Sequence, residues 1–221
     1  KSFINNTNIF LNLVEAVRKF SPKSKILSVG SSEEYGCVSK ECLPLVETNV
    51  LRPTSPYAVA RVSQEMLSLV FTQGYGMRIV MTRSFNHIGR YQKEVFVIPK
   101  LISQFVRAER MGKREVVIKA GDLDVVRDFT DVRDVVKAYT LLLEHGVVGE
   151  IYNVCSGIGY RLIDVVDIIG RITGVRPTVI TDKTFIRPLE NKEIVGCNDK
   201  IKDCCGWEPS ISLEESIKDI I

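Results

Sequence analysis

Apolar residues occur along the chain in two patterns, short continuous runs and longer stretches in which they return every three or four positions. The runs predict buried strands, and the stretches predict amphipathic helices. Strands are expected at residues 25–30, 78–83, 116–118, 151–154 and 178–180. Helices are expected at residues 5–20, 56–73, 97–111, 132–145 and 162–173, with a last one on Leu213 and Ile217. Because strands alternate with helices, we expect an α/β fold built on a doubly wound parallel sheet.

The pattern also predicts helix ends and buried faces. In the first helix the apolar spacing is kept by Ile9, Leu13, Val17 and Phe20, and in the second by Tyr57, Val62, Met66, Leu69 and Val70. Ser55 is suited to cap the second helix, Pro56 to begin it and Gly74 to end it. The residues expected to cap and brace the helix at 132–145 are Asp128, Asp131, Arg133 and Asp134.

A tyrosine and an arginine lie one turn apart at the start of the second helix. Tyr57 and Arg61 therefore share a helical face, where the cation favours the phenolate form of the tyrosine. Upstream, the hydroxyls and carboxylates of residues 31–34 follow the strand at 25–30, and open α/β sheets bind ligands at the carboxyl ends of their strands. The two groups together indicate a proton-transfer site. The alternative is a surface helix that carries Tyr57 and Arg61 by chance.

Composition narrows the class of protein. The formal net charge is +3 with 26% charged residues and no basic stripe, so nucleic acid is not an expected partner. No apolar run reaches the length of a membrane span and no secretory signal is visible, so we expect a soluble, cytoplasmic protein without a membrane partner. The cysteines lack the spacing of zinc sites, and two histidines do not make a metal site by themselves. Cys155 is interpreted as a small buried hydrophobic residue.

Five segments carry a resemblance to a known family. They lie at residues 30–36 (GSSEEYG), 83–89 (RSFNHIG), 126–134 (VRDFTDVRD), 152–157 (YNVCSG) and 187–190 (RPLE). With these segments the chain resembles the extended short-chain dehydrogenase/reductase family of NAD-dependent nucleotide-sugar epimerases, dehydratases and reductases. The most specific match is to the GDP-4-keto-6-deoxy-D-mannose reductases, and the resemblance covers essentially the whole chain.

The resemblance implies a catalytic set and a cofactor. Ser31, four residues before the tyrosine of a Tyr-Gly pair, matches the family's catalytic serine, and Tyr57 matches its tyrosine. Arg61 stands where the family has a lysine that contacts the nicotinamide ribose. Arginine keeps the charge but is planar and bulkier, so this exchange is not conservative. Tyr57, Arg61 and His87 are then expected at the cofactor, which would be NADP or NAD.

The resemblance also implies residues that bind a GDP-sugar substrate: Ser32, Asn86, Lys100, Asp122, Arg127, Arg187 and Glu190. Arg127 and Arg187 would clamp the diphosphate, as guanidinium groups do. Asp122 would accept from guanine N1–H and N2–H, and Glu190 from a ribose hydroxyl. From the residues alone, an Asx turn at Asp122 and surface ion pairs at the arginines remain open, as does an ordinary turn at Asn86.

One motif of dinucleotide sites does not occur in this sequence, the G-x-G-x-x-G turn that holds a pyrophosphate. Because the family carries this turn near its N-terminus, we expect the chain to be the C-terminal two-thirds of a longer enzyme, and inactive alone. Residues 1–89 would complete a Rossmann-type cofactor domain. Residues 90–221 would form mainly a smaller α/β substrate domain, with 125–155 returning to the Rossmann sheet. The alternative to a part of a longer enzyme is a naturally glycine-free domain with another task. A homodimer is also expected.

The activity that the resemblance implies is NAD(P)H-dependent reduction of the 4-keto group of GDP-4-keto-6-deoxy-D-mannose to give GDP-D-rhamnose. Tyr57 would donate the proton, Ser31 would orient the oxygen, and Arg61 would stabilise the phenolate and the cofactor ribose. A GDP-mannose 4,6-dehydratase is the first alternative, with Glu33 as the base at C5. A catalytically silent nucleotide-sugar-binding paralogue is the second.

Overall fold

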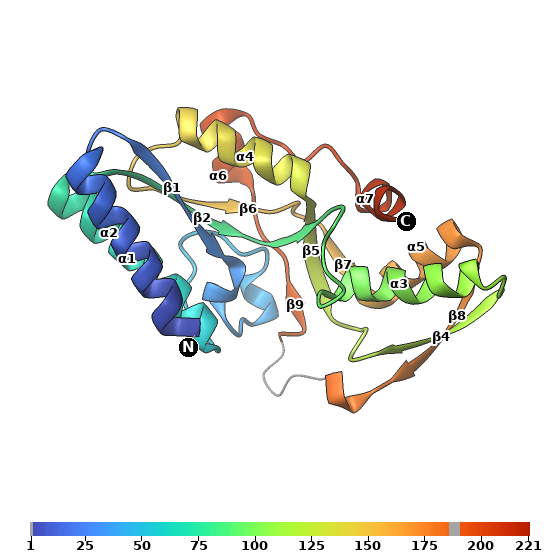
Figure 1. The fold of residues 1–221 in the computed structure, drawn as a ribbon. Helices are drawn as coiled ribbons and strands as arrows, with labels where there is room; N and C mark the ends of the chain where they lie inside the picture. Colours follow the sequence, from blue (N-terminus) through green and yellow to red (C-terminus); the bar gives the residue numbers. More distant parts are fainter. Residues whose placement is uncertain (1, 186–190) are drawn as a thin grey trace.

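The computed structural model describes residues 2–185 and 191–221, in which helices pack against small sheets of mainly parallel strands (Figure 1). The first sheet has the strand order β1-β2-β6, and all its strands are parallel. Its members are β1 (Lys25–Ser31), β2 (Arg78–Ser84) and β6 (Ile151–Val154). Ser31 pairs in register with Ser84, so β1 and β2 end at the same edge.

Helices cover both faces of this sheet. They are α1 (Ser2–Phe20), α2 (Pro56–Tyr75), α4 (Val132–His145) and α6 (Asp199–Cys205). Along β2, Ile79 and Met81 pack into the core formed with α1 and α2, whereas Val80 packs into the core formed with α4 and α6. The strand is buried on both faces, which explains its continuous apolar run. The predicted α/β fold with parallel strands is confirmed.

Most of the other elements surround a third core. The strands are β3 (Asn86–Ile88), β4 (Glu115–Ala120), β5 (Val126–Asp131), β7 (Gly159–Arg161), β8 (Arg176–Thr181) and β9 (Glu193–Ile194). The helices are α3 (Val97–Arg110), α5 (Leu162–Thr173) and α7 (Leu213–Ile220), and short 3-10 turns are η1 (Ser32–Tyr35), η2 (Lys40–Cys42) and η3 (Lys183–Phe185). β4 pairs with β8, and β5 pairs with β3, β7 and β9. Phe105, Ile118 and Ile169 are fully buried in this core.

The predicted buried face of α1 is wrong for Ile9, Leu13 and Phe20, and it is confirmed only for Val17, which is partly buried against the core. Ile9 is 69% exposed, and Leu13 and Phe20 are exposed as well. Phe10 and Val14 are buried instead, in the core that α1 shares with α2 and β2. The helix carries apolar residues on two sides, and the spacing rule selected the side that other elements do not cover.

The predicted apolar face of α2 is wrong in part: Leu69 packs against the core, but the helix also buries polar residues. Gln64 and Ser68 are buried, whereas Met66 and Val70 are exposed. The burial is possible because the polar groups have partners: Gln64 Nε2 and Ser68 Oγ each donate to Ser28 Oγ at 3.0 Å.

The predicted helix starts are confirmed, and one predicted end is wrong. The Ser55 and Asp131 side chains each accept a hydrogen bond from a backbone N–H in the first turn of their helices. α2 continues past Gly74 and ends at Gly76, whose φ of 67° is left-handed. Glycine adopts this conformation without steric cost, which makes Gly76 the better cap.

Several short elements are absent from the sequence-based prediction. Residues 86–88, predicted as a turn, form β3 by pairing with β5. The remaining unpredicted elements are β5, β7, β9 and α6. Strands of two or three residues are too short to show a period, so pairing rather than pattern defines them. Residues 125–155 were predicted to return to the Rossmann sheet. Of the two strands in this segment, β6 lies in the first sheet, whereas β5 lies in the sheet with β3.

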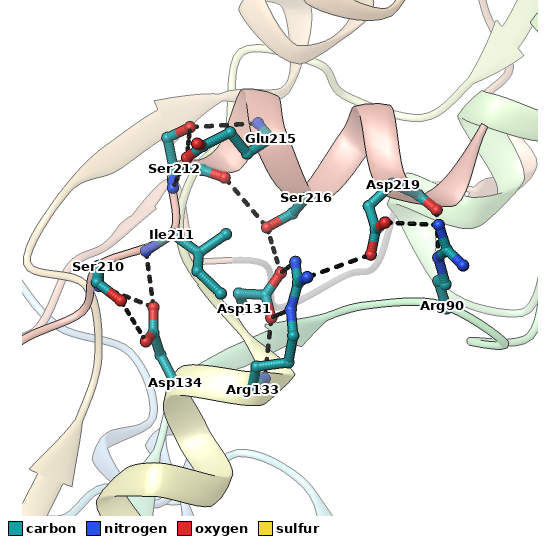
Figure 2. A network of polar contacts seen from close by, with 10 residues as sticks. All are labelled: Arg90, Asp131, Arg133, Asp134, Ser210, Ile211, Ser212, Glu215, Ser216 and Asp219. Atoms are coloured by element: carbon teal, nitrogen blue, oxygen red, sulfur yellow. Dashed lines mark hydrogen bonds and ion pairs between the residues drawn. The ribbon is translucent and has the colours of Figure 1, made fainter.

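Carboxylates at the start of α4 hold the chain before and within α7 (Figure 2). Asp134 accepts hydrogen bonds from Ser210 N, Ser210 Oγ and Ile211 N at 2.8 to 2.9 Å. Asp131 accepts from Ser216 Oγ at 2.6 Å and pairs with Arg133. Asp131 therefore caps α4 and Asp134 braces it, as predicted, whereas the same prediction for Asp128 is wrong, because Asp128 accepts from Ser156, Gly157 and Gly196 instead.

We expect Asp134→Ala to lower the free energy of unfolding by about 3 kcal/mol, because it leaves the N–H groups of residues 210 and 211 without a charged acceptor. Urea unfolding measures the change. The matched control is Asp164→Ala, which removes an exposed pair with Arg161 and should cost about 0.5 kcal/mol or less. Equal losses in the two variants would contradict this role of Asp134.

Candidate active site

A cavity of about 320 Å³ lies at the carboxyl ends of β1 and β2. The predicted site residues that line it are Ser31, Tyr57, Asn86 and His87. Other lining residues are Val29, Gly30, Ser84, Phe85, Gln92, Phe96, Val97, Ile98, Pro99 and Phe129. Parallel strands end together at this edge, which is where such sheets bind ligands. Residues that are far apart in the sequence thus meet in one site.

Ser31 is held in place by the turn that follows β1. It is the N-cap of η1, and its Oγ accepts a hydrogen bond from Glu33 N at 3.2 Å. In return, Ser31 N donates to Glu34 Oε1 at 2.7 Å, which completes a capping box. The serine hydroxyl therefore has a fixed position at the cavity wall.

Tyr57 lies in the first turn of α2, directly after the cap at Ser55 and the proline at the first helical position. The Arg61 guanidinium lies over the Tyr57 ring, with its central carbon 5.0 Å from the ring centroid. Arg61 Nη1 donates to Gln64 Oε1 at 2.7 Å, whereas its buried Nε has no hydrogen-bond partner among the described residues. The predicted pairing of a phenol with a cation is present.

Asn86 and His87 come from β3. Asn86 Nδ2 donates to Asp128 O at 3.0 Å, and Gln92 Nε2 donates to His87 O at 3.0 Å. Burial lowers the pKa of the His87 imidazole, so its neutral form is favoured. In the part of the chain that the structure describes, His87 Nε2 is buried without a hydrogen-bond partner.

Ser84 and Tyr139 extend the hydroxyl groups of the site, and the sequence-based prediction missed both. Their hydroxyl oxygens lie 2.7 Å apart, and the Tyr139 ring meets the His87 ring edge-on. Burial raises the pKa of the Tyr139 phenol, which keeps it protonated. Ser84 could have been found from its place at the end of the strand at 78–83. Tyr139 fits the apolar spacing of its helix, so the sequence pattern did not distinguish it from a core residue.

Ser32 and Glu33 are not among the residues that line the cavity. Ser32 is buried. Glu33 is exposed, and its Oε2 lies 3.5 Å from Ser55 Oγ. Their predicted contacts with substrate remain predictions.

The residues predicted to bind the nucleotide lie away from this cavity. Asp122 pairs with Lys192, and its Oδ1 accepts from Asp124 N at 2.9 Å, so the Asx turn that remained open as the alternative for Asp122 is present. The hydrogen bond from Lys192 lowers the pKa of Asp122. Arg127 Nη1 donates to Val126 O at 2.8 Å. The Lys100 ammonium lies 3.4 Å from the centroid of the Phe185 ring.

Arg187 and Glu190 lie outside the described residues. Within the described ones, no cluster of histidine, cysteine, aspartate and glutamate is arranged to hold a metal ion. No helix among them is both long and apolar enough to cross a membrane. Cys155 is fully buried, and burial raises the pKa of its thiol, which agrees with its interpretation as a core residue.

Known proteins resemble the chain over nearly its whole length. The family model described as GDP-mannose 4,6 dehydratase matches residues 2–220. GDP-6-deoxy-D-mannose reductase of Pseudomonas aeruginosa is 35% identical over 211 residues, which cover 96% of this chain and 69% of that protein. The solved structure of RMD from Pseudomonas aeruginosa complexed with NADPH has a TM-score of 0.90 at 33% identity, over 97% of this chain and 70% of that one. The dTDP-glucose 4,6-dehydratase of Bacillus anthracis in complex with NAD has a TM-score of 0.85 at 26% identity, over 98% and 66%.

Proposed function

The chain belongs to the GDP-mannose 4,6-dehydratase family, and on that premise we propose that it serves in the NAD(P)H-dependent reduction of the 4-keto group of GDP-4-keto-6-deoxy-D-mannose to GDP-D-rhamnose. The observation that carries the proposal is the single cavity that Ser31, Tyr57, Asn86 and His87 line together. The similarity to a GDP-6-deoxy-D-mannose reductase supports this substrate class.

The residues at the cavity fit the nicotinamide end of NADP or NAD. The lining combines apolar side chains with the Tyr57 phenol, and His87 Nε2 is a buried polar atom that a ligand can satisfy. When bound, the cofactor supplies the hydride for the keto carbon. Solved relatives described as complexes with NADPH and with NAD support either form.

The chain's own groups then supply the proton and fix the oxygen. The Ser31 Oγ accepts from Glu33 N, so its hydroxyl hydrogen remains available for the substrate oxygen at C4. Tyr57 donates its proton to that oxygen as the ketone becomes an alcohol. The Arg61 guanidinium lies over the Tyr57 ring, so a cation faces the residue that gives up its proton.

The position of Glu33 favours the reductase over the dehydratase. A dehydratase needs a base at the substrate C5, and Glu33 is exposed and outside the lining of the cavity. Besides the hydride of the cofactor, a reductase needs a proton donor and an oxygen-binding hydroxyl, and both Tyr57 and Ser31 line the cavity. Arg61 occupies the position at which the family has a lysine. A catalytically silent paralogue is therefore one of the outcomes that the test below distinguishes.

We expect Tyr57→Phe in the full-length protein to lower turnover by roughly 10²–10⁴-fold, because the proton donor is lost. Binding of the GDP-sugar should stay within a few-fold. Turnover is measured as NADPH oxidation together with product analysis by NMR. Tyr75→Phe, at the exposed end of the same helix, is the matched control and should change neither quantity.

The same assay decides between the alternatives. Conversion of GDP-mannose without added NADPH would support the dehydratase instead. GDP-sugar binding without turnover, in wild type as well, would support the silent paralogue. Arg61→Lys should keep or raise turnover if Arg61 does the work of the family's lysine, since the charge is retained in a more compact group.

At the nucleotide end, we propose that Arg127 and Arg187 bind the diphosphate and that Asp122 accepts from guanine. Losing one charge-assisted contact should weaken binding by about 1.5 to 3 kcal/mol, or roughly one to two powers of ten. Arg127→Ala should therefore weaken GDP but not guanosine, as measured by calorimetry. Arg161→Ala is the control, since Arg161 lies on the neighbouring strand and pairs with Asp164.

Asp122 tests the base preference separately. For Asp122 to accept from guanine, its pair with Lys192 must open, so Asp122→Ala should reduce the preference for GDP over UDP without a large loss of diphosphate binding. If Arg127→Ala weakened guanosine and GDP equally, its role would be structural. If the ratio of the affinities for GDP and UDP were unchanged in Asp122→Ala, Asp122 would have no role beyond its Asx turn.

We also propose that the protein forms a homodimer through α1 and α2. These helices pack together and leave apolar side chains exposed on their outer sides: Ile9, Leu13, Val59, Met66 and Val70. Exposed apolar patches of this kind are typical of protein interfaces.

Sedimentation should give a dimer for the wild type and a monomer for the double variant Leu13→Glu/Met66→Glu, because two charges would be buried without partners. Tyr91→Glu is the control, since Tyr91 is 97% exposed elsewhere on the surface. A dimer that survives the double variant would place the interface on another face.

A further inference from the structure

Glu34 is a buried acid directly behind the proposed site. Its side chain is fully buried, and its Oε1 accepts from Ser31 N at 2.7 Å. Oε2 has no hydrogen-bond partner among the described residues. The carboxyl group lies so close to the strand end that a Cβ at Gly30 would come within 2.3 Å of Oε1. Glycine at this position therefore makes room for the acid.

The cation closest to Glu34 is Arg83, and it already forms an ion pair with Glu65. Arg83 donates from Nε and Nη2 to Glu65 at 2.9 and 2.8 Å, and from Nη1 to Glu47 O at 2.9 Å. Its Nε is 4.0 Å from Glu34 Oε2, beyond hydrogen-bond distance. Two buried carboxyl groups thus share one guanidinium. If both were ionised, the buried group would carry a net negative charge, which burial disfavours.

We propose that Glu34 is a positioning residue for the proton-transfer site, and that it holds the Ser31 turn as a neutral carboxylic acid. In that form Oε1 accepts from Ser31 N, and the proton is on Oε2, the oxygen that has no hydrogen-bond partner among the described residues. Ionisation places a second negative charge beside Glu65 and draws the carboxyl group toward water, which disturbs the Ser31 cap. The effect on turnover rests on the reductase function proposed above.

The electrostatics of the surrounding groups agree with this form. Burial, and next the negative charge of Glu65, raise the pKa of Glu34 to about 8. The hydrogen bond from Ser31 N and the charge of Arg83 act in the opposite direction and are outweighed. The other titratable group against Arg83 is the Tyr35 phenol, and burial raises its pKa to about 12, so it stays neutral over the same range.

The proposal predicts how stability depends on pH. The ordinary pKa of a glutamate is 4.5, and the folded-state pKa of Glu34 lies above it at about 8. The folded state therefore holds this proton more tightly, so the contribution of Glu34 is complete below about pH 4.5 and is lost as the pH rises to about 8. Glu34→Gln keeps a neutral acceptor for Ser31 N, and its stability should decline less over that window.

Infrared spectroscopy tests the protonation state without substrate. The wild-type protein should show the absorption of a protonated carboxylic acid at about pH 6, and this band should vanish as the pH passes about 8. Glu34→Gln should lack the band, and Glu33→Gln, which changes the exposed neighbour in the same turn, should retain it. A wild-type spectrum without the band at about pH 6 would overturn the proposal, even if the Gln variant failed to fold.

The positioning role is tested by the pH profile of turnover in the full-length protein. The wild-type kcat should fall as the pH passes about 8, and Glu34→Gln should lack this limb while retaining activity at lower pH. An identical alkaline limb in both proteins would overturn the positioning role. The infrared and unfolding measurements need no substrate, so they still report on Glu34 if the reductase function fails.

Discussion

The buried ion pair between Arg83 and Glu65 joins the two elements on which the candidate site is built. Arg83 belongs to β2 and Glu65 to α2, and the side chains of both are almost fully buried. Tyr57, Arg61 and Glu65 follow one another at four-residue intervals, so they share one side of α2. Holding Glu65 against β2 therefore fixes the rotation of the helix and with it the direction in which Tyr57 faces the strand end. Breaking such a pair from one side typically costs 3–5 kcal/mol, because a buried charge is left alone.

The same arginine connects the pair to the rest of the site. Its guanidinium lies over the Tyr35 ring, and the Tyr35 hydroxyl donates to Asn153 Oδ1 on β6 at 2.7 Å. Asn153 N in turn donates to Glu47 Oε1, which brings the segment after η2 into the network. The strand β1, the turn after it and β6 are thus held around Arg83. Ser31 thus begins a turn whose Tyr35 packs against this polar core.

The sequence predicts those parts of the fold that depend on local pattern. Strand ends and helix caps follow from residues next to one another, which is why Ser31 and Tyr57 could be placed together before the structure was known. The face of α2 could not be predicted, because burial of Glu65 and Gln64 depends on partners at Arg83 and Ser28, which lie far away in the sequence. Lys100, Asp122 and Arg127 were expected by resemblance alone, and no strand end brings them to the cavity.

The number of donors around a buried carboxyl group explains why this chain treats its acids differently. Asp128 is fully buried and accepts from Ser156 N, Ser156 Oγ, Gly157 N and Gly196 N, so both of its oxygens are satisfied in the ionised form. Burial raises the pKa of Asp128 above its ordinary value, and these hydrogen bonds limit the rise. Glu34 is buried to the same degree but receives one backbone N–H and lies beside Glu65. When few donors surround a carboxyl group, burying its protonated form costs less free energy than burying its ionised form. Glu34, in the turn that begins at Ser31, therefore has a stronger reason than Asp128 to keep its proton when buried.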